Sequence, residues 1–294
     1  MRALLTGLTT LVLLTVNTVF FFIPILLLAV LRLIMPHKGL KRTVANAITK
    51  VAETWAEGFK LIINVCTKVK WDIRGQQDLN KQSSYLVLSN HQSWVDIPAL
   101  IQAFNNRTPY FKFFLKKELI WVPFLGFAFW ALDYPFMSRY SKETLRKKPH
   151  LKGKDIEVTK AACEKFKGIP VTVVNYVEGT RFTPEKKAHQ NSPYKHLLRP
   201  KTGSLAFTLG TLGEQFDTLL DVTVYYPAGV PTFWELISGQ VDEIVVDVKS
   251  QPLDPTLWQG DYDNDAEFRK VTRDWITQLW HEKDDLLEEL KSTH

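Results

Sequence analysis

Cysteine is scarce in this sequence, and no stretch rich in glycine and serine divides the chain after residue 67. Only Cys66 and Cys163 occur in the 294 residues, which excludes a disulfide framework or a cysteine-based zinc cluster and fits a reducing, cytoplasm-facing location. Internal repeats and low-complexity tracts are also absent. A mean hydropathy of -0.11 excludes a polytopic membrane protein, while 45% hydrophobic residues are enough to form a core and exclude disorder as the main state.

Charge is absent from residues 3–31, which lie between Arg2 and Arg32. A straight helix of this length would reach about 43 Å, against a hydrocarbon core of about 30 Å, so one tilted or overhanging span fits and two do not. Pro24 could kink the helix or turn it into an element that dips in and returns, and both alternatives stay open. The run is longer than that of a signal peptide and lacks a small-residue cleavage site, so residues 1–36 are expected to form an uncleaved membrane anchor.

Basic residues follow this anchor before the first acid, Glu53. They are Arg32, Lys38, Lys41, Arg42 and Lys50. Because positive charge concentrates on the cytoplasmic side of membrane spans, the rest of the chain is expected to face the cytoplasm.

Residues 37–67 are expected to form an amphipathic interfacial helix. Its apolar residues recur at spacings of three and four along one stripe: Val44, Ile48, Val51, Trp55, Phe59 and Ile62. Two interpretations stay open. The helix packs on its own domain, or it lies in the headgroup layer, which the basic start and the adjacent anchor favour.

Residues 68–294 are expected to form one α/β domain, with a mostly parallel or mixed sheet flanked by helices. Short apolar runs alternate with helical patterns, as in chains that build a largely parallel sheet. Strands are expected at 85–89, 171–177, 221–226 and 243–248, and helices from the early nineties to about 104 and at 155–167, 203–213 and 265–290.

Two further segments have unusual compositions. Residues 120–132 carry no charge and are rich in aromatic side chains; they form a core helix or a face that contacts substrate or membrane. Residues 139–154 are strongly basic with one acid, Glu143, which is typical of a solvated loop but also suits anionic headgroups or an acidic carrier protein. Nucleic acid is a poor explanation for this charge in a membrane-anchored chain, so no nucleic-acid partner is expected.

The strongest local motif covers residues 90–96, where the apolar strand 85–89 ends. Ligand crevices form at such strand ends in α/β sheets. His91 there can act as a general base, and Asp96 can hold its other ring nitrogen and stabilise the imidazolium. A spacing of five does not bring two side chains together on one helix, so the pair meets only if His91 lies on the turn and Asp96 in the entering helix.

A plainer interpretation of the same residues is a helix cap and an ordinary loop histidine. His150 and Asp155 repeat the spacing without a strand before them, so the spacing alone is weak support. A second group of residues strengthens the functional interpretation of His91 and Asp96. Residues 178–181 also follow a predicted strand, and here Gly179 permits close backbone approach, Thr180 offers a hydroxyl and Arg181 offers a planar fork for phosphate.

These residues can also be read as a turn that carries a surface arginine. Lys201, at a predicted helix start, would add charge beside them, unless it only marks a junction between loop and helix.

Together, the motifs at 90–96 and 178–181 resemble the first and third blocks of the glycerolipid acyltransferase family, typified by bacterial 1-acylglycerol-3-phosphate acyltransferase. Both occur in the right order, and the resemblance covers roughly residues 80–230. The whole chain looks most like the YihG-type branch of the bacterial inner membrane, and it also resembles the animal lysocardiolipin acyltransferases.

The resemblance implies roles for individual residues. His91 would be the catalytic base and Asp96 its partner, while the acceptor's glycerol phosphate would be held by Glu178, Gly179, Thr180 and Arg181, with Arg139 from the second block and Lys201 nearby. The chain departs from the family pattern at several positions: Asp133 replaces the usual glycine, Ser138 an acid and Val177 a proline, and residues 224–227 match the fourth block only loosely.

The implied reaction is transfer of a fatty acyl group from a thioester to the free hydroxyl of a lysophospholipid, with 1-acylglycerol-3-phosphate as the expected acceptor and phosphatidic acid as the product. Lysophosphatidylglycerol is the alternative acceptor, and a non-catalytic lipid-binding protein is the more distant alternative. Acyl-CoA or acyl-carrier protein would be the donor, and no cofactor or metal is expected, because His91, Asp96 and Glu178 lack a ligand-like spacing. No nucleophile elbow of the Gly-x-Ser-x-Gly type occurs, so no acyl-enzyme is needed.

Overall fold

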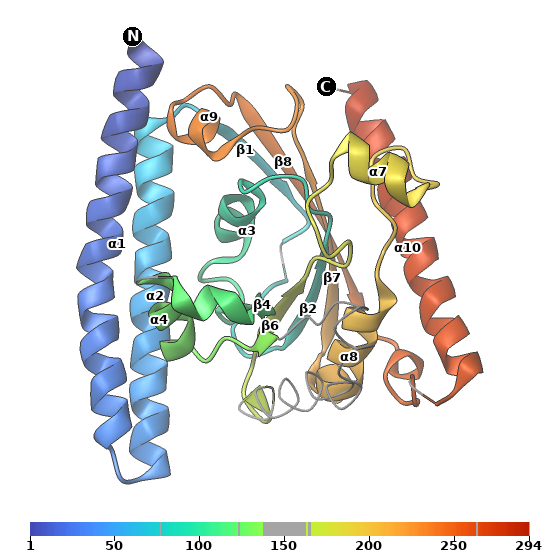
Figure 1. The fold of residues 1–294 in the computed structure, drawn as a ribbon, viewed down its shortest axis with the longest axis horizontal. Helices are drawn as coiled ribbons and strands as arrows, with labels where there is room; N and C mark the ends of the chain where they lie inside the picture. Colours follow the sequence, from blue (N-terminus) through green and yellow to red (C-terminus); the bar gives the residue numbers. More distant parts are fainter. Residues whose placement is uncertain (77, 123, 138–162, 164–165, 263, 294) are drawn as a thin grey trace, which may run out of the picture.

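A six-stranded sheet in the order β1-β8-β7-β2-β6-β3 forms the centre of the molecule (Figure 1). The computed structural model describes residues 1–76, 78–122, 124–137, 163, 166–262 and 264–293. The strands of the sheet are β1 (Lys70–Arg74), β2 (Tyr85–Ser89), β3 (Phe111–Phe113), β6 (Thr172–Asn175), β7 (Thr218–Tyr225) and β8 (Glu243–Pro252). Two short strands, β4 (Leu115–Lys116) and β5 (Phe136–Met137), pair in parallel by themselves.

The sheet is mixed, and its strand directions bring the site together. Strands β7, β2, β6 and β3 run parallel, whereas β8 is antiparallel to β7 and parallel to β1. The carboxyl ends of β2, β6 and β7 therefore meet at one edge, which is where ligands bind in sheets of this kind. This confirms the expected α/β fold with a mostly parallel or mixed sheet.

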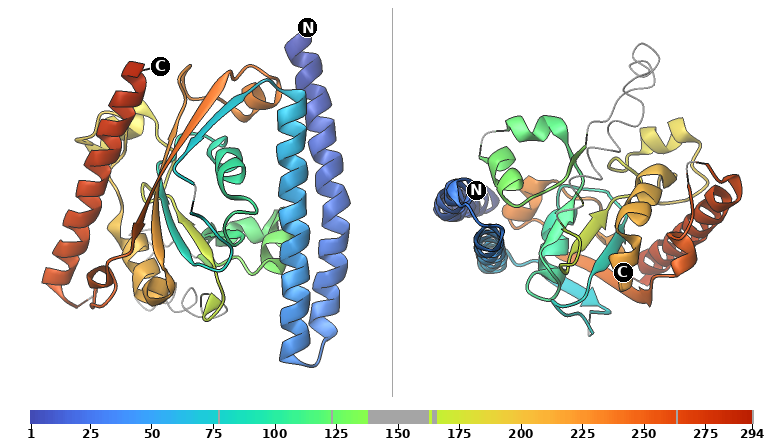
Figure 2. Two further views of the ribbon diagram at one scale, coloured as in Figure 1. Left: turned by 180° about the vertical axis from the view of Figure 1, so that it is seen from behind. Right: turned by 90° about the horizontal axis from the view of Figure 1, so that it is seen from below.

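Helices cover both faces of this sheet (Figures 1 and 2). The helical elements are α1 (Arg2–Ile34), α2 (Lys38–Cys66), α3 (Asp96–Phe104), η1 (Lys117–Trp121), α4 (Leu125–Ala131), α7 (Pro184–Gln190), α8 (Thr202–Leu212), η4 (Gly213–Gln215), α9 (Phe233–Ile237), η5 (Pro255–Leu257) and α10 (Ala266–Thr293). Helices α1, α2 and α3 lie on one side, with α1 outermost, and α8 and α10 lie on the other.

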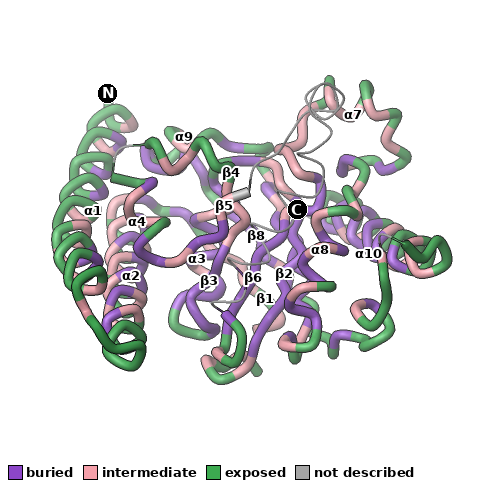
Figure 3. Tube along the Cα trace, turned by 60° about the horizontal axis from the view of Figure 1, so that its bottom comes forward, coloured by how far each residue is buried: buried purple, intermediate pink, exposed green. Residues whose placement is uncertain are grey.

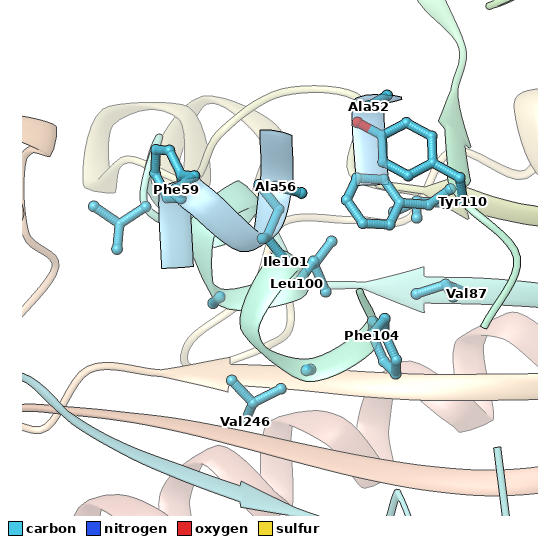
Figure 4. Close-up of a cluster of buried hydrophobic side chains, with 14 of the residues drawn as sticks. Ala52, Ala56, Phe59, Val87, Leu100, Ile101, Phe104, Tyr110 and Val246 are labelled. Carbon is cyan, nitrogen blue, oxygen red and sulfur yellow. The ribbon is translucent and has the colours of Figure 1, made fainter. Parts of the chain in front are cut away.

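Two apolar clusters form the core, one on each face, because successive side chains of a strand point to opposite faces. In β2, Val87 packs in the cluster beneath α2 and α3, while Leu86 and Leu88 pack in the cluster beneath α8 and α10. Figure 4 shows the first cluster, where Ala56 of α2 faces Leu100 of α3. Buried residues follow the sheet in Figure 3, whereas much of α1 is exposed.

Helix α1 runs unbroken through Pro24 and lies beside α2. Within the described residues it is the one helix long and apolar enough to cross a membrane, with a mean hydropathy of 2.6 and 11% of the apolar window buried. Near its start, Gly7 lies against Trp234 of α9, where a side chain would meet the indole ring. At its last turn, the Arg32 guanidinium pairs with Asp133 at 2.7 Å.

The apolar stripe of α2 faces the interior. Val44, Ile48 and Phe59 are buried in the core cluster, and Trp55 packs against its edge. Of the two interpretations of this helix, the packing matches a helix held against its own domain. The boundaries expected at residues 36 and 67 fall close to the ends of α1 and α2, and the division into an anchor, an interfacial helix and a catalytic domain stays a prediction.

In the described residues of the uncharged segment 120–132, the end of η1 and the short helix α4 form in place of one core helix. Ala131 is buried and Phe127 packs on the core, whereas Trp121 and Phe124 are exposed, and contact of this segment with substrate or membrane stays a prediction. The ring of Phe124 also contacts Phe22 of α1 edge-on at 5.2 Å between centroids. Most of the helix expected at 155–167 lies outside the described residues.

Candidate active site

His91 and Asp96 meet at the carboxyl end of β2. His91 lies on the turn and Asp96 is the first residue of α3, so the spacing of five brings together the side chains as the sequence suggests. The Nδ1 atom of His91 donates to Oδ2 of Asp96 at 2.7 Å. The same oxygen accepts the backbone amides of Gln92 at 2.7 Å and Ser93 at 3.0 Å. With Nδ1–H held in this way, Nε2 is the ring nitrogen that can accept a proton.

The turn that carries His91 is fixed to its neighbours in the sheet. The side-chain amide of Asn90 both donates to and accepts from the backbone of Val224 in β7, each at 2.8 Å. The backbone oxygen of His91 accepts the amide of Phe182 at 2.7 Å. Because Asp96 is fully buried while 18% of the His91 side chain is exposed, the turn offers the base to solvent and hides its partner.

Two tyrosines at the ends of neighbouring strands surround the pair. Tyr176, after β6, stacks on the His91 ring at 4.1 Å between centroids and 18° between planes. Tyr226, after β7, donates its hydroxyl to Oδ1 of Asp96 at 2.5 Å. Burial raises the pKa of both phenols well above the usual value, with the Asp96 charge adding to the effect, so both hydroxyls stay protonated.

Glu178 supports the same turn from the opposite side. It is fully buried, and its two carboxyl oxygens accept the backbone amides of His91 at 3.2 Å and Leu198 at 3.1 Å. Burial raises the pKa of Glu178 to about 8, although both backbone hydrogen bonds act to lower it. Glu178 ties the base's backbone to the 198 loop, and its contact with an acceptor stays a prediction.

The residues that follow Glu178 gather positive charge. Gly179 has a φ of +68°, and a Cβ there would lie 3.1 Å from Nζ of Lys201, so glycine lets the lysine come close. The Thr180 hydroxyl accepts a hydrogen bond from Nζ of Lys186 at 2.9 Å. Lys201 thus lies beside the 178–181 motif as the sequence suggested, and Lys186 of α7 joins it.

Arg181 completes this group from a partly exposed position. Its guanidinium lies 4.5 Å from the centroid of the Trp94 ring, a cation–π contact between the two motifs. Arg139 and His150, expected as a further acceptor contact and as an unrelated loop histidine, both lie outside the described residues.

Trp94 also lines an apolar groove. The groove has a volume of about 400 Å³ and is lined by α2, α3 and α9, including Trp55, Phe59, Ile101 and Phe233. Trp94 thus both lines the apolar groove and contacts the Arg181 guanidinium. Such a pairing suits a ligand with an apolar chain and an anionic head.

Three groups that acyl-transfer chemistry can use thus lie at one edge of the sheet: a general base, its buried carboxylate partner and a cluster of cationic side chains. The described part of the chain contains no group of three or more His, Cys, Asp or Glu side chains that could hold a metal ion. Cys66 and Cys163 lie away from this edge, at the end of α2 and in the core cluster beneath α8 and α10.

Sequence reasoning missed Lys186 and gave no role to Asn90, Tyr176 or Tyr226. Tyr226 ends the predicted strand 221–226, and a position at a strand end is the signal that singled out His91 and Glu178, so that rule would have found it. Tyr176 lies inside the predicted strand 171–177, whereas the observed β6 ends earlier, at Asn175. Lys186 carries no such signal, because its contact with Thr180 depends on how the 181–184 turn folds back.

Comparison with known proteins agrees with this geometry. The family profile described as Acyltransferase matches residues 70–226, which is more than half of the chain and contains both motifs. The chain is 27% identical to 1-acyl-sn-glycerol-3-phosphate acyltransferase 3 of Arabidopsis thaliana over 57% of its own length and 46% of the relative's. It is 26% identical to lysocardiolipin acyltransferase 1 of Mus musculus over 81% of its own length and 62% of the relative's.

The chain therefore spans about half to three fifths of these curated relatives. Among solved structures, the 1-acyl-sn-glycerophosphate acyltransferase of Thermotoga maritima superposes with a TM-score of 0.51 at 20% identity, covering 95% of this chain and 98% of that one, which shows a shared fold. A closer tie to the YihG-type branch stays a prediction. The profile match, with both motifs at one sheet edge, shows that the chain belongs to the acyltransferase family.

Proposed function

We propose that this protein transfers a fatty acyl group from an acyl thioester to the free hydroxyl of a lysophospholipid, with 1-acylglycerol-3-phosphate as the acceptor and phosphatidic acid as the product. The observation that carries the proposal is the 2.7 Å hydrogen bond between His91 and buried Asp96, at the sheet edge where Arg181, Lys186 and Lys201 also gather. A base beside a cationic cluster suits an acceptor that carries both a hydroxyl and a phosphate.

In the proposed reaction, Nε2 of His91 takes the proton of the acceptor hydroxyl as the oxygen attacks the thioester carbonyl. Asp96 stabilises the imidazolium that forms. When the tetrahedral intermediate collapses, the ester bond is complete, and the departing thiolate of acyl-CoA or acyl-carrier protein receives the proton from His91. General base catalysis of this kind contributes about 10²- to 10⁴-fold, and positioning supplies much of the rest.

The acceptor's two ends fit different parts of the site. We assign its phosphate to Arg181, Lys186 and Lys201, with Arg139 as a further proposed contact outside the described residues. Its acyl chain would lie in the groove that Trp94 lines together with other apolar side chains. A second acceptor, lysophosphatidylglycerol or a similar lysolipid, is favoured by the likeness to a protein named lysocardiolipin acyltransferase.

We further propose that the protein is bound to the cytoplasmic face of a bacterial inner membrane through α1, which lies along the bilayer surface rather than across it. A spanning helix would place its ends on opposite sides of the membrane. Here Gly7 contacts Trp234 and Arg32 pairs with Asp133, and both partners belong to the same α/β domain. Large apolar side chains are exposed along the length of α1, including Leu5, Val12 and Leu27.

Acyl transfer by the purified, detergent-solubilised protein tests the proposed activity. Labelled oleoyl-CoA would be offered with lysophosphatidic acid or lysophosphatidylglycerol in separate reactions, with acyl-carrier protein as the alternative donor. We expect His91→Ala to lower the rate by about 10²-fold or more, whereas His150→Ala, which changes the other histidine of the same spacing, leaves the rate unchanged.

The acceptor that gives the faster acyl transfer identifies the substrate. Equal activity of wild type and His91→Ala would contradict the assignment of the base. No product from wild type with any acceptor and either donor would contradict the enzymatic proposal and favour a lipid-binding protein.

A further inference from the structure

Tyr226 lies where β7 ends, and its hydroxyl is buried against the carboxylate that holds the base. The distance from its hydroxyl to Oδ1 of Asp96 is 2.5 Å, within the range of hydrogen bonds between a hydroxyl and a carboxylate. The other oxygen of Asp96 accepts Nδ1–H of His91. One carboxylate thus joins the tyrosine to the histidine.

The fold fixes Tyr226 relative to the turn. Asn90, directly before His91, exchanges two hydrogen bonds with the backbone of Val224, two residues before Tyr226. Strands β2 and β7 pair in parallel with Ser89 opposite Val222. Asn90 and the strand register therefore tie the end of β7, which carries Tyr226, to the turn that carries His91.

The groups that face His91 come from four elements. Asp96 is on α3, Tyr176 stacks on the ring from the end of β6, and Glu178 accepts the His91 backbone amide. Tyr226, at the end of β7, contacts Asp96, which in turn contacts the His91 ring. The charge of Lys283, on α10, acts on Glu178. In the described part of the chain, Tyr226 is the one side chain besides His91 itself that donates a hydrogen bond to Asp96.

We infer that Tyr226 is a positioning residue that holds Asp96 against His91 and reduces the negative charge on the Asp96 oxygen that faces the imidazole. A hydroxyl that donates to a carboxylate draws charge away from the oxygen that faces the histidine. The imidazolium is then held less strongly, so the base returns its proton more readily to the departing thiolate. This inference rests on the proposed acyl transfer and concerns how the same site works.

Tyr226→Phe tests the inference, with kcat and KM measured between pH 5 and pH 9. Loss of the hydroxyl leaves the carboxylate charge unshared and Asp96 less well oriented. We expect kcat to fall about 10-fold with little change in KM, as for partial loss of a general base. The acid limb of kcat/KM should move to higher pH, by about 0.5 pH unit, because the charge on Asp96 stabilises the imidazolium more strongly.

Tyr225→Phe is the matched control. Tyr225 is the preceding residue, and its side chain packs with the cluster on the opposite face of the sheet. We expect this variant to keep the wild-type pH profile. An acid limb and a kcat that are both unchanged in folded Tyr226→Phe would overturn the inference.

A second measurement covers the case in which Tyr226→Phe does not fold. Tyr226→3-fluorotyrosine keeps the shape and strengthens the hydrogen-bond donor, so the acid limb should move to lower pH; no shift would overturn the inference. Failure of the proposed function gives a different result, because wild type itself would then show no transfer.

Discussion

Glu178 is a carboxyl group that folding removes from water while both of its oxygens stay occupied by backbone amides. Its raised pKa, about 8, means that the folded protein keeps this side chain protonated at pH values where the unfolded chain has already ionised it. Below pH 4.5, both states hold the proton. As the pH rises from about 4.5 to 8, only the unfolded state gains by ionising, and the folded state loses stability relative to it.

Glu178→Gln removes this titration and leaves one of the two backbone amides without its oxygen. At pH 5 we expect the variant to unfold about 2–6 °C below wild type, from the loss of about 1–2 kcal/mol of hydrogen bonding. The difference should shrink and then change sign as the pH approaches 8, because only wild type carries the titrating group and loses stability as the pH rises. Tryptophan fluorescence during heating in detergent measures the unfolding temperatures of wild type and variant at each pH. A difference between them that does not change with pH would contradict the assigned protonation of Glu178.

Among the elements, α7 brings a lysine to the site that no motif marks. Thr183 accepts the backbone amide of Lys186 at the helix start, and Nζ of Lys186 reaches back to the Thr180 hydroxyl and the Arg181 carbonyl at 2.9 and 2.8 Å. The next residue, Lys187, points its amine to the backbone oxygen of Lys195 instead. Two adjacent lysines on one short helix thus differ in what they can bind.

Lys186→Met should raise KM for a phosphate-bearing acceptor about 10-fold with little loss of kcat, since a charged hydrogen bond to phosphate contributes about 1.5–3 kcal/mol. Lys187→Met is the control that keeps the helix and changes the net charge by the same amount. Steady-state kinetics with lysophosphatidic acid compares the two. Equal KM values for both variants would show that Lys186 acts only through net charge.

The elements that the sequence predicts well are those with strong local patterns. The continuous apolar run of β2 and the motif after it lead directly to the His91–Asp96 pair, because parallel strand ends share an edge. Strand β1 was missed although Lys70, Asp72 and Arg74 alternate with apolar residues, a pattern typical of a half-buried strand, and it pairs with β8. The role of Tyr226 depends on the register between β7 and β2, which local sequence does not encode.

At the scale of the whole molecule, α1 is fastened to the domain at several points rather than at one end. Besides the contacts of Gly7 and Arg32, Asn17 donates to the backbone oxygen of Trp55, and Gly58 gives its side chain room. The exposed face between these contacts is apolar, whereas α10 lies on the far side of the sheet (Figure 2). The two sides of the molecule are therefore unlike in their affinity for lipid.

Val12→Asp places a charge at a residue that is 60% exposed on the apolar face of α1. We expect binding to vesicles of phosphatidylglycerol and phosphatidylethanolamine to weaken about 10-fold or more, because apolar burial is lost and a charge must be desolvated. Val271→Asp makes the same change on α10 and should bind as wild type does. Flotation of the full chain with the vesicles measures both, and equal binding of the two variants would contradict the proposed role of α1.

Because α1 is attached to the domain at several points, the protein would meet its lipid substrate within the plane of the membrane. A site held rigidly beside a helix in the bilayer surface samples molecules that diffuse within that surface, not those in solution. Its rate would then follow the mole fraction of lysolipid in the membrane, and adding inert phospholipid at constant total lysolipid would slow the enzyme by dilution within the plane. The bilayer would thus determine the substrate concentration that the site experiences.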